Sequence, residues 1–174
     1  MGYIAVPASG QSGDADVVAF SKTTASTTST TLANAFAFTG LTFAATSVFR
    51  ITVWGRNSVG TPLAFLRIQV SDGTTTSSFT EFQVMTNNGT VSWRASIIIS
   101  QQNSATATAA YCASLSGGGV LDPAVHTSSL ITLGGSLTWA AQTVINVQHR
   151  TNIITTTTVV CDGCMIEKIS GVGN

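Results

Sequence analysis

The clearest strand pattern in this sequence is Val48-Phe49-Arg50-Ile51-Thr52-Val53-Trp54-Gly55-Arg56. Successive side chains of a strand point to opposite faces, so Phe49, Ile51 and Val53 share one apolar face. The opposite face carries polar, charged and aromatic side chains, namely Arg50, Thr52, Trp54 and Arg56. An apolar face beside a mixed face is typical of a strand in an antiparallel sheet. The stretch therefore predicts a strand that packs one side against the protein core.

Comparable strand patterns recur along the rest of the chain. The predicted strands cover residues 16–21, 32–43, 48–56, 63–70, 77–85, 91–100, 103–114, 126–133, 136–150 and 153–169. Residues 23–31 are rich in Thr and Ser and predict a loop or a polar edge strand, while Asp72-Gly73 and Asn87-Asn88-Gly89 predict turns. No window sustains apolar residues at helical spacing without β-branched residues dominating it. The sequence therefore predicts an all-β fold, an antiparallel β-sandwich, jelly roll or barrel.

The chain carries little charge. Charged residues make up 8% of it, against about 25% in ordinary soluble domains, and seven basic side chains balance seven acidic ones. Because these charges are scattered singly and form no basic stripe, we expect no nucleic-acid partner. A net charge near zero favours association. It fits an ordinary neutral protein, but it fits better a subunit whose surface is largely covered by its neighbours.

The length of 174 residues fits a single domain. Residues 1–15 predict a short extended N-terminal arm, and residues 16–174 predict the β-domain. Tyr3, Ile4 and Val6 are apolar residues of the arm and the candidate contacts with a neighbouring subunit. The first residues lack the basic and apolar regions of a signal peptide, and no apolar run is long enough to span a membrane. We therefore expect no membrane partner.

The motif Cys161-Asp162-Gly163-Cys164 resembles a chemical site. A pair of this spacing supplies half of a zinc site or a redox dithiol. Zinc needs four ligands, so further side chains would have to converge on the pair, from His126, His149 and Cys112. Positions three apart point to opposite faces of a regular strand, but a bulge at Asp162-Gly163 would bring both sulfurs together. Cys161 and Cys164 are thus weak metal candidates with a disulfide as the alternative; packed thiols are favoured, and we expect no cofactor.

The sequence offers no catalytic constellation. Its two histidines lie in the segments HTSS and VQHR, no GxSxG nucleophile motif is present, and the carboxylates are isolated. We therefore expect no enzymatic activity and assign no catalytic residue. The tryptophans lie in strongly alternating stretches, which favours core anchoring over ligand stacking for Trp54, Trp93 and Trp139. Carbohydrate binding by exposed aromatic residues is the alternative interpretation.

Four segments carry a family resemblance. They are 48–56 (VFRITVWGR), 92–99 (SWRASIII), 143–149 (TVINVQH) and 159–169 (VVCDGCMIEKI). Together they resemble the β jelly-roll domain of tailed-phage virion proteins, which opens with an aromatic-Arg-hydrophobic-Thr strand and closes with a Cys-containing strand that ends in Ile-Glu-Lys. The resemblance covers residues 45–169. His149 stands where the family pattern has Trp, and Cys164 is not part of that pattern.

The resemblance implies a jelly-roll sandwich that forms a homotrimer on the virion surface. Because the predicted arm is short and no fibre shaft precedes the domain, we expect a capsid decoration (cement) protein, made in the host cytoplasm and bound to the capsid exterior. Its expected partners are its own copies and the major capsid protein of a phage shell. The alternative is a receptor-binding or structural domain of a tail fibre or tail tip, with a host surface glycan as the further partner.

Overall fold

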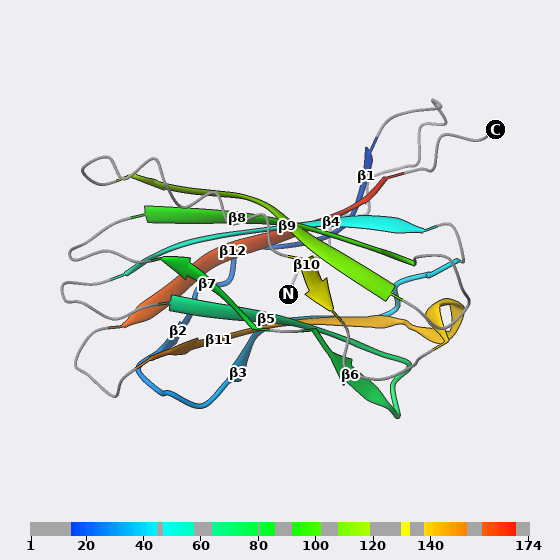
Figure 1. Ribbon diagram of the computed structural model, residues 1–174, viewed down its shortest axis with the longest axis horizontal. Coiled ribbons are helices and arrows are strands. Elements are labelled where there is room, and N and C mark those ends of the chain that lie inside the picture. Colours follow the sequence, from blue (N-terminus) through cyan, green and yellow to red (C-terminus); the bar gives the residue numbers. More distant parts are fainter. Residues whose placement is uncertain are drawn as a thin grey trace.

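The computed structural model describes residues 15–44, 47–57, 64–79, 81–85, 92–101, 108–118, 130–132, 138–152 and 158–169. These residues form two antiparallel sheets that pack face to face, with one short 3-10 turn as their helical element. Figure 1 shows the two layers, with β4, β8, β9 and β12 in the upper one and β3, β5, β6 and β11 in the lower one. The predicted all-β fold and the β-sandwich architecture are confirmed. None of the described residues forms a helix with the length and apolarity that a membrane crossing needs.

The larger sheet, called sheet A here, has the order β1-β12-β4-β8-β9-β10, and β2 also pairs with β12. Its strands are β1 (Ala15–Ser21), β2 (Ala25–Thr27), β4 (Val48–Asn57), β8 (Ser92–Gln101), β9 (Thr108–Gly118), β10 (Leu130–Thr132) and β12 (Val159–Ile169). The smaller sheet, sheet B, has the order β3-β11-β5-β6, and β7 also pairs with β5. Its strands are β3 (Ala33–Phe38), β5 (Ala64–Ser71), β6 (Thr76–Ser78), β7 (Phe82–Met85) and β11 (Val144–Thr151).

The core lies between the sheets and is filled by alternate residues of the long central strands. Sheet A contributes Phe49, Ile51, Val53, Trp93, Ala95, Ile97, Ile99 and Ile166. Sheet B contributes Leu66, Ile68, Val70, Ile145 and Val147. The predicted inward face of residues 48–56 is confirmed, because Phe49, Ile51 and Val53 all lie buried in the core, while Thr52 is buried on the opposite face. Trp54 is the exception among the tryptophans: Trp93 and Trp139 are buried, whereas Trp54 is half-buried on the outer face.

Two predicted strands are interrupted where a large aromatic residue enters the core. Residues 77–85 contain two strands, β6 and β7; between them the buried Phe79 donates its backbone N–H to the Ile68 carbonyl of β5 at 2.9 Å. Residues 136–150 contain a 3-10 turn, Trp139–Ala141, before β11 begins at Val144. Trp139 meets the edge of Phe43 with ring centroids 4.7 Å apart. A 3-10 turn this short leaves no periodicity in a sequence, which is why residues 136–150 were predicted as a single strand.

Hydroxyl and carboxyl side chains stabilise the turns. In the Thr/Ser-rich stretch after β1, Ser29 donates its backbone N–H to the Thr27 hydroxyl, and β2 forms the polar edge strand that was one of its two predicted structures. In the predicted turn at Asp72-Gly73, Asp72 accepts N–H bonds from Thr74 and Thr75, which lower the pKa of its carboxyl group. Gly73 has φ 93°, a conformation that favours glycine.

Candidate functional site

The Cys161/Cys164 motif lies in the middle of β12, at a β-bulge. Cys161 pairs with Gly55 and Gly163 pairs with Trp54, so Asp162 is the extra residue between two regular pairs. The bulge turns both sulfurs to the same side, and Cys161 and Cys164 are fully buried as free thiols in the core. In this structure both residues are thus packed thiols, and the bulge is the one that the sequence pointed to at Asp162-Gly163.

His149 lies across the core from this pair, on the inner face of β11. Its Nδ1 is 3.4 Å from the Cys161 sulfur, and the imidazole is 2% exposed. Burial lowers the pKa of His149 to about 4 and raises the pKa of Cys161 to about 12, because a dry core disfavours both charged forms. The pair is therefore a neutral imidazole beside a neutral thiol. A thiolate nucleophile or ligand needs the opposite, an electropositive and partly exposed setting.

The other metal candidates do not join this cluster within the described part of the chain. No group of three His, Cys, Asp or Glu side chains that could hold a metal occurs among the described residues. His126 lies outside them, as do Tyr3, Ile4 and Val6 of the predicted arm; Cys112 belongs to β9, whose side chains are not described. The first residue of β1 is Ala15, which the sequence assigned to the arm.

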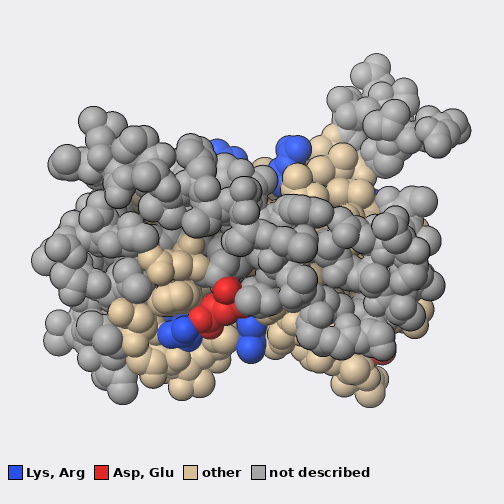
Figure 2. Space-filling model, viewed as in Figure 1, with Lys and Arg blue, Asp and Glu red and all other residues tan. Residues whose placement is uncertain are grey.

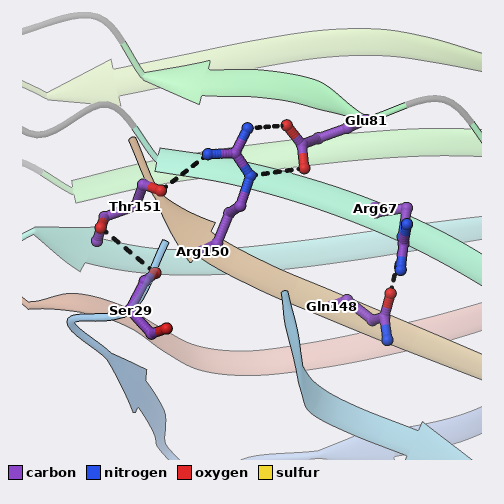
Figure 3. A network of polar contacts seen from close by, with 6 residues as sticks. All are labelled: Ser29, Arg67, Glu81, Gln148, Arg150 and Thr151. Carbon is purple, nitrogen blue, oxygen red and sulfur yellow. Dashed lines mark hydrogen bonds and ion pairs between the residues drawn. The ribbon is translucent and has the colours of Figure 1, made fainter. Parts of the chain in front are cut away.

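The outer face of sheet B carries a network of polar contacts that satisfy one another (Figure 3). Arg150 donates two bonds to the Glu81 carboxylate and a third to the Thr151 carbonyl at 2.9 Å. Its guanidinium carbon lies 4.3 Å from the centroid of the Phe65 ring, and the Glu81 bond raises the pKa of Arg150. Because a bidentate pair of this kind is geometrically specific, it fixes the segment before β7 against β11.

A second branch of this network crosses three strands of sheet B. Arg67 of β5 donates through Nε to the Gln148 amide oxygen at 2.8 Å, and the Gln148 amide nitrogen donates to Asn34 at 2.9 Å. Beside it, Gln69 donates to the Ser78 hydroxyl at 2.8 Å. Figure 2 shows basic and acidic side chains gathered in one group over β5 and β11. The amides and cations of this face thus find most of their partners within the sheet.

The outer face of sheet A is different, because apolar side chains lie open on its edge strand β1. Val17, Val18 and Phe20 are 42%, 40% and 44% exposed, and they are the exposed large hydrophobic residues found in the described part of the chain. The register between β1 and β12 shifts between Val17 and Ala19, so Val18 is an extra residue and the regular alternation is lost. Alternation therefore gave no signal for this apolar edge, and the adjacent valines in the sequence were the one hint.

Trp54 lies on this same outer face, with its indole over Gly163 of β12. A methyl group on Gly163 would be 2.2 Å from Cζ2 and 2.6 Å from Cε2 of the indole, so the ring packs directly on the glycine backbone. The Phe20 ring is next to it, with centroids 6.1 Å apart and planes 31° apart. We call Phe20 and Trp54 the aromatic pair. The half-buried position of Trp54 on the outer face contradicts its expected place in the core. Trp54 follows Val53 directly in the strand, so its side chain points to the other face of the sheet.

Charged groups surround the aromatic pair. Arg56 forms an ion pair with Asp162 at 2.5 Å, and the Lys22 ammonium is 5.5 Å from the Phe20 centroid. Arg94 is the register partner of Trp54 on β8; it is exposed and has no ion-pair partner among the residues that the structure describes. The surface is thus aromatic at its centre and cationic at its margin.

No protein-family model matches the chain, and no curated protein matches its sequence. The two outer faces of the sandwich and the strand motifs are the features that bear on function.

Proposed function

We propose that this protein is a structural subunit of a tailed-phage particle, a jelly-roll homotrimer that decorates and stabilises the capsid. The observation that carries the proposal is the apolar edge strand: Val17 and Val18 lie open to solvent on β1 in a chain that has little charge elsewhere. Exposed apolar residues gathered in one place mark surfaces that contact another protein. An edge strand with open backbone groups is also a natural place for subunits to meet.

The arrangement of the family-like segments supports the same proposal. Residues 159–169, 48–56 and 92–99 lie in β12, β4 and β8, which are adjacent strands of sheet A. Segments that resemble one family and are far apart in sequence therefore form one continuous surface. Residues 143–149 lie almost wholly in β11 of the opposite sheet, where His149 faces Cys161 in the place that the family pattern gives to Trp.

The oligomeric state tests the first part of the proposal. Native mass spectrometry of the full chain should give a trimer. Val18→Asp places a charge on the exposed bulge of β1 and should shift the mass to monomer. Ala37→Asp is the matched control, because Ala37 is an exposed position on β3, an edge strand of sheet B, and should leave the trimer intact. A wild-type monomer would overturn the proposal.

Shell binding tests the second part. Capsid shells without the decoration protein should bind the full chain at a saturable stoichiometry, and electron microscopy should place it on the shell exterior. Removal of residues 2–13, which include Tyr3, Ile4 and Val6, should lower the occupancy. Undiminished binding would remove the arm from the proposal, and localisation to the tail would favour the tail-fibre alternative.

A further inference from the structure

We infer that the aromatic pair is a binding platform for an acidic saccharide, a site that does not depend on the capsid assignment. The first observation is that the Trp54 indole packs over the backbone of Gly163 and is half-buried on the outer face of sheet A. Gly163 leaves room for it: a methyl group there would collide with the indole at 2.2 Å and with the Ser21 carbonyl oxygen at 2.9 Å. An indole that is partly open to solvent offers apolar area on which the apolar face of a sugar ring can stack.

The second observation is that Phe20 extends this surface. Phe20 is 44% exposed and lies on β1, which is separated from β4 by β12. The centroids of the Phe20 and Trp54 rings are 6.1 Å apart, and their planes differ by 31°. The Lys22 ammonium lies over the Phe20 ring, 5.5 Å from its centroid, so a ligand at this place meets aromatic area and a cation together.

The third observation is the charge around the rings. The Arg56–Asp162 ion pair offers both hydrogen-bond donors and acceptors, with side chains 53% and 23% exposed. Lys22 and Arg94 are exposed and have no acidic partner in the described residues, so the margin has surplus positive charge although the chain as a whole is neutral. The ligand that complements flat aromatic rings, hydroxyl-binding groups and surplus cations is a saccharide that carries a carboxylate or sulfate.

A second copy of this chain is a poorer occupant for the aromatic pair. In a two-fold pairing, two such surfaces would bring Lys22 and Arg94 of one copy near the same residues of the other, and like charges in an interface oppose association. In a threefold assembly the aromatic pair would meet a different surface, and the mass of the Trp54→Ala variant tests that contact. The exposed Val17 and Val18, farther along β1, carry no such restriction. We therefore assign subunit contact to the valines and saccharide binding to the aromatic pair.

Isothermal titration calorimetry of the full chain, which does not depend on tryptophan as the reporter, tests the proposal. The probes are oligosaccharides of galacturonic acid, of N-acetylneuraminic acid and of sulfated glucosamine–uronate repeats, each beside a neutral counterpart such as the methyl ester. At least one acidic probe should bind, at least tenfold more tightly than its neutral form. Trp54→Ala and Arg94→Glu should each weaken binding at least tenfold. Arg67→Ala, which changes an arginine on the outer face of sheet B, should leave it unchanged.

Other outcomes overturn the proposal. It fails if no acidic probe binds at millimolar concentration, if neutral forms bind as well, or if an acidic peptide such as oligoglutamate competes equally. Native mass spectrometry of Trp54→Ala separates this site from the proposed trimer: the variant should keep the wild-type mass. Loss of the oligomer in that variant would assign the aromatic pair to subunit contact instead.

Discussion

The two outer faces of the sandwich differ in whether their side chains find partners within the protein. On sheet B, Arg150 is held by Glu81, and Arg67 by Gln148, which in turn donates to Asn34. On sheet A, aromatic and aliphatic side chains lie open beside cations that have surplus charge. A face whose polar groups are paired within the protein gains little from a partner. A face with open apolar area and unpaired charge gains much, because binding removes that area from water and supplies the missing charge.

The largest expected effect compares the inner and outer sides of sheet A at two glycines. A methyl group on Gly55 would lie 2.0 Å from the Val160 carbonyl oxygen and 2.6 Å from Cζ2 of the buried Trp93. Neither can retreat, so Gly55→Ala should destabilise the fold by about 3 kcal/mol, the upper range for over-packing. Gly163→Ala should cost less, about 1–2 kcal/mol, because Trp54 on the outer face can turn toward solvent and only the Ser21 carbonyl oxygen, 2.9 Å away, then has to shift. Urea unfolding measures both.

The same two glycine variants also test the proposed saccharide site at the aromatic pair. If Gly163→Ala moves Trp54, its fluorescence and saccharide binding should change while the fold persists. Equal destabilisation by the two substitutions would mean that Trp54 is held as tightly as the side chains of the core. The outer face of sheet A would then accommodate an added methyl group no better than the core does.

The next effect compares one arginine from each outer face. Arg150→Ala removes two bonds to Glu81 and the contact with Phe65, and leaves a half-buried carboxylate without its cation. It should lower the free energy of unfolding by about 2 kcal/mol, as expected for charged hydrogen-bond partners. Arg94→Ala should change it by less than about 0.5 kcal/mol, the usual range for a surface position. If Arg94→Ala is the more costly substitution, the contrast between the two faces is wrong.

Much of this difference between the outer faces of sheets A and B could not be predicted from the sequence. Alternation predicted the central strands and the inward face of Phe49, Ile51 and Val53, because a two-residue period reports burial directly. It also predicted that Trp54 lies on the opposite face from Val53, yet residue type alone favoured the core for it. Strand order was needed to show that Gly163, distant in sequence, lies beneath the indole.

Pairings between distant residues were equally hard to predict. Nothing local in the sequence joins Glu81 to Arg150 or Arg67 to Gln148, since these contacts depend on which strands become neighbours. The bulge at Asp162 was foreseen as one way to bring two cysteines together, because a spacing of three is otherwise incompatible with a shared face. The bulge at Val18 had no such signal, and with it the exposure of β1 went unpredicted.

The smallest expected effect is on the pH dependence of stability, and it comes from His149 in the core between the two sheets. Burial lowers its pKa to about 4, while in the unfolded chain an ordinary histidine has a pKa near 6.5. Between these values the unfolded chain binds more protons than the folded one, so the stability of the fold falls as pH falls from 6.5 toward 4. Unfolding in urea at pH 6 and at pH 5 should differ by about 1 kcal/mol on account of this group.

His149→Gln removes the titrating group and should flatten that part of the pH profile, whatever it does to the stability at pH 7. Arg67→Ala serves as the control, since it removes a bond to Gln148, the neighbour of His149 on β11, and should leave the slope in place. If the slope survives His149→Gln, the loss of stability in acid does not come from the buried imidazole beside Cys161.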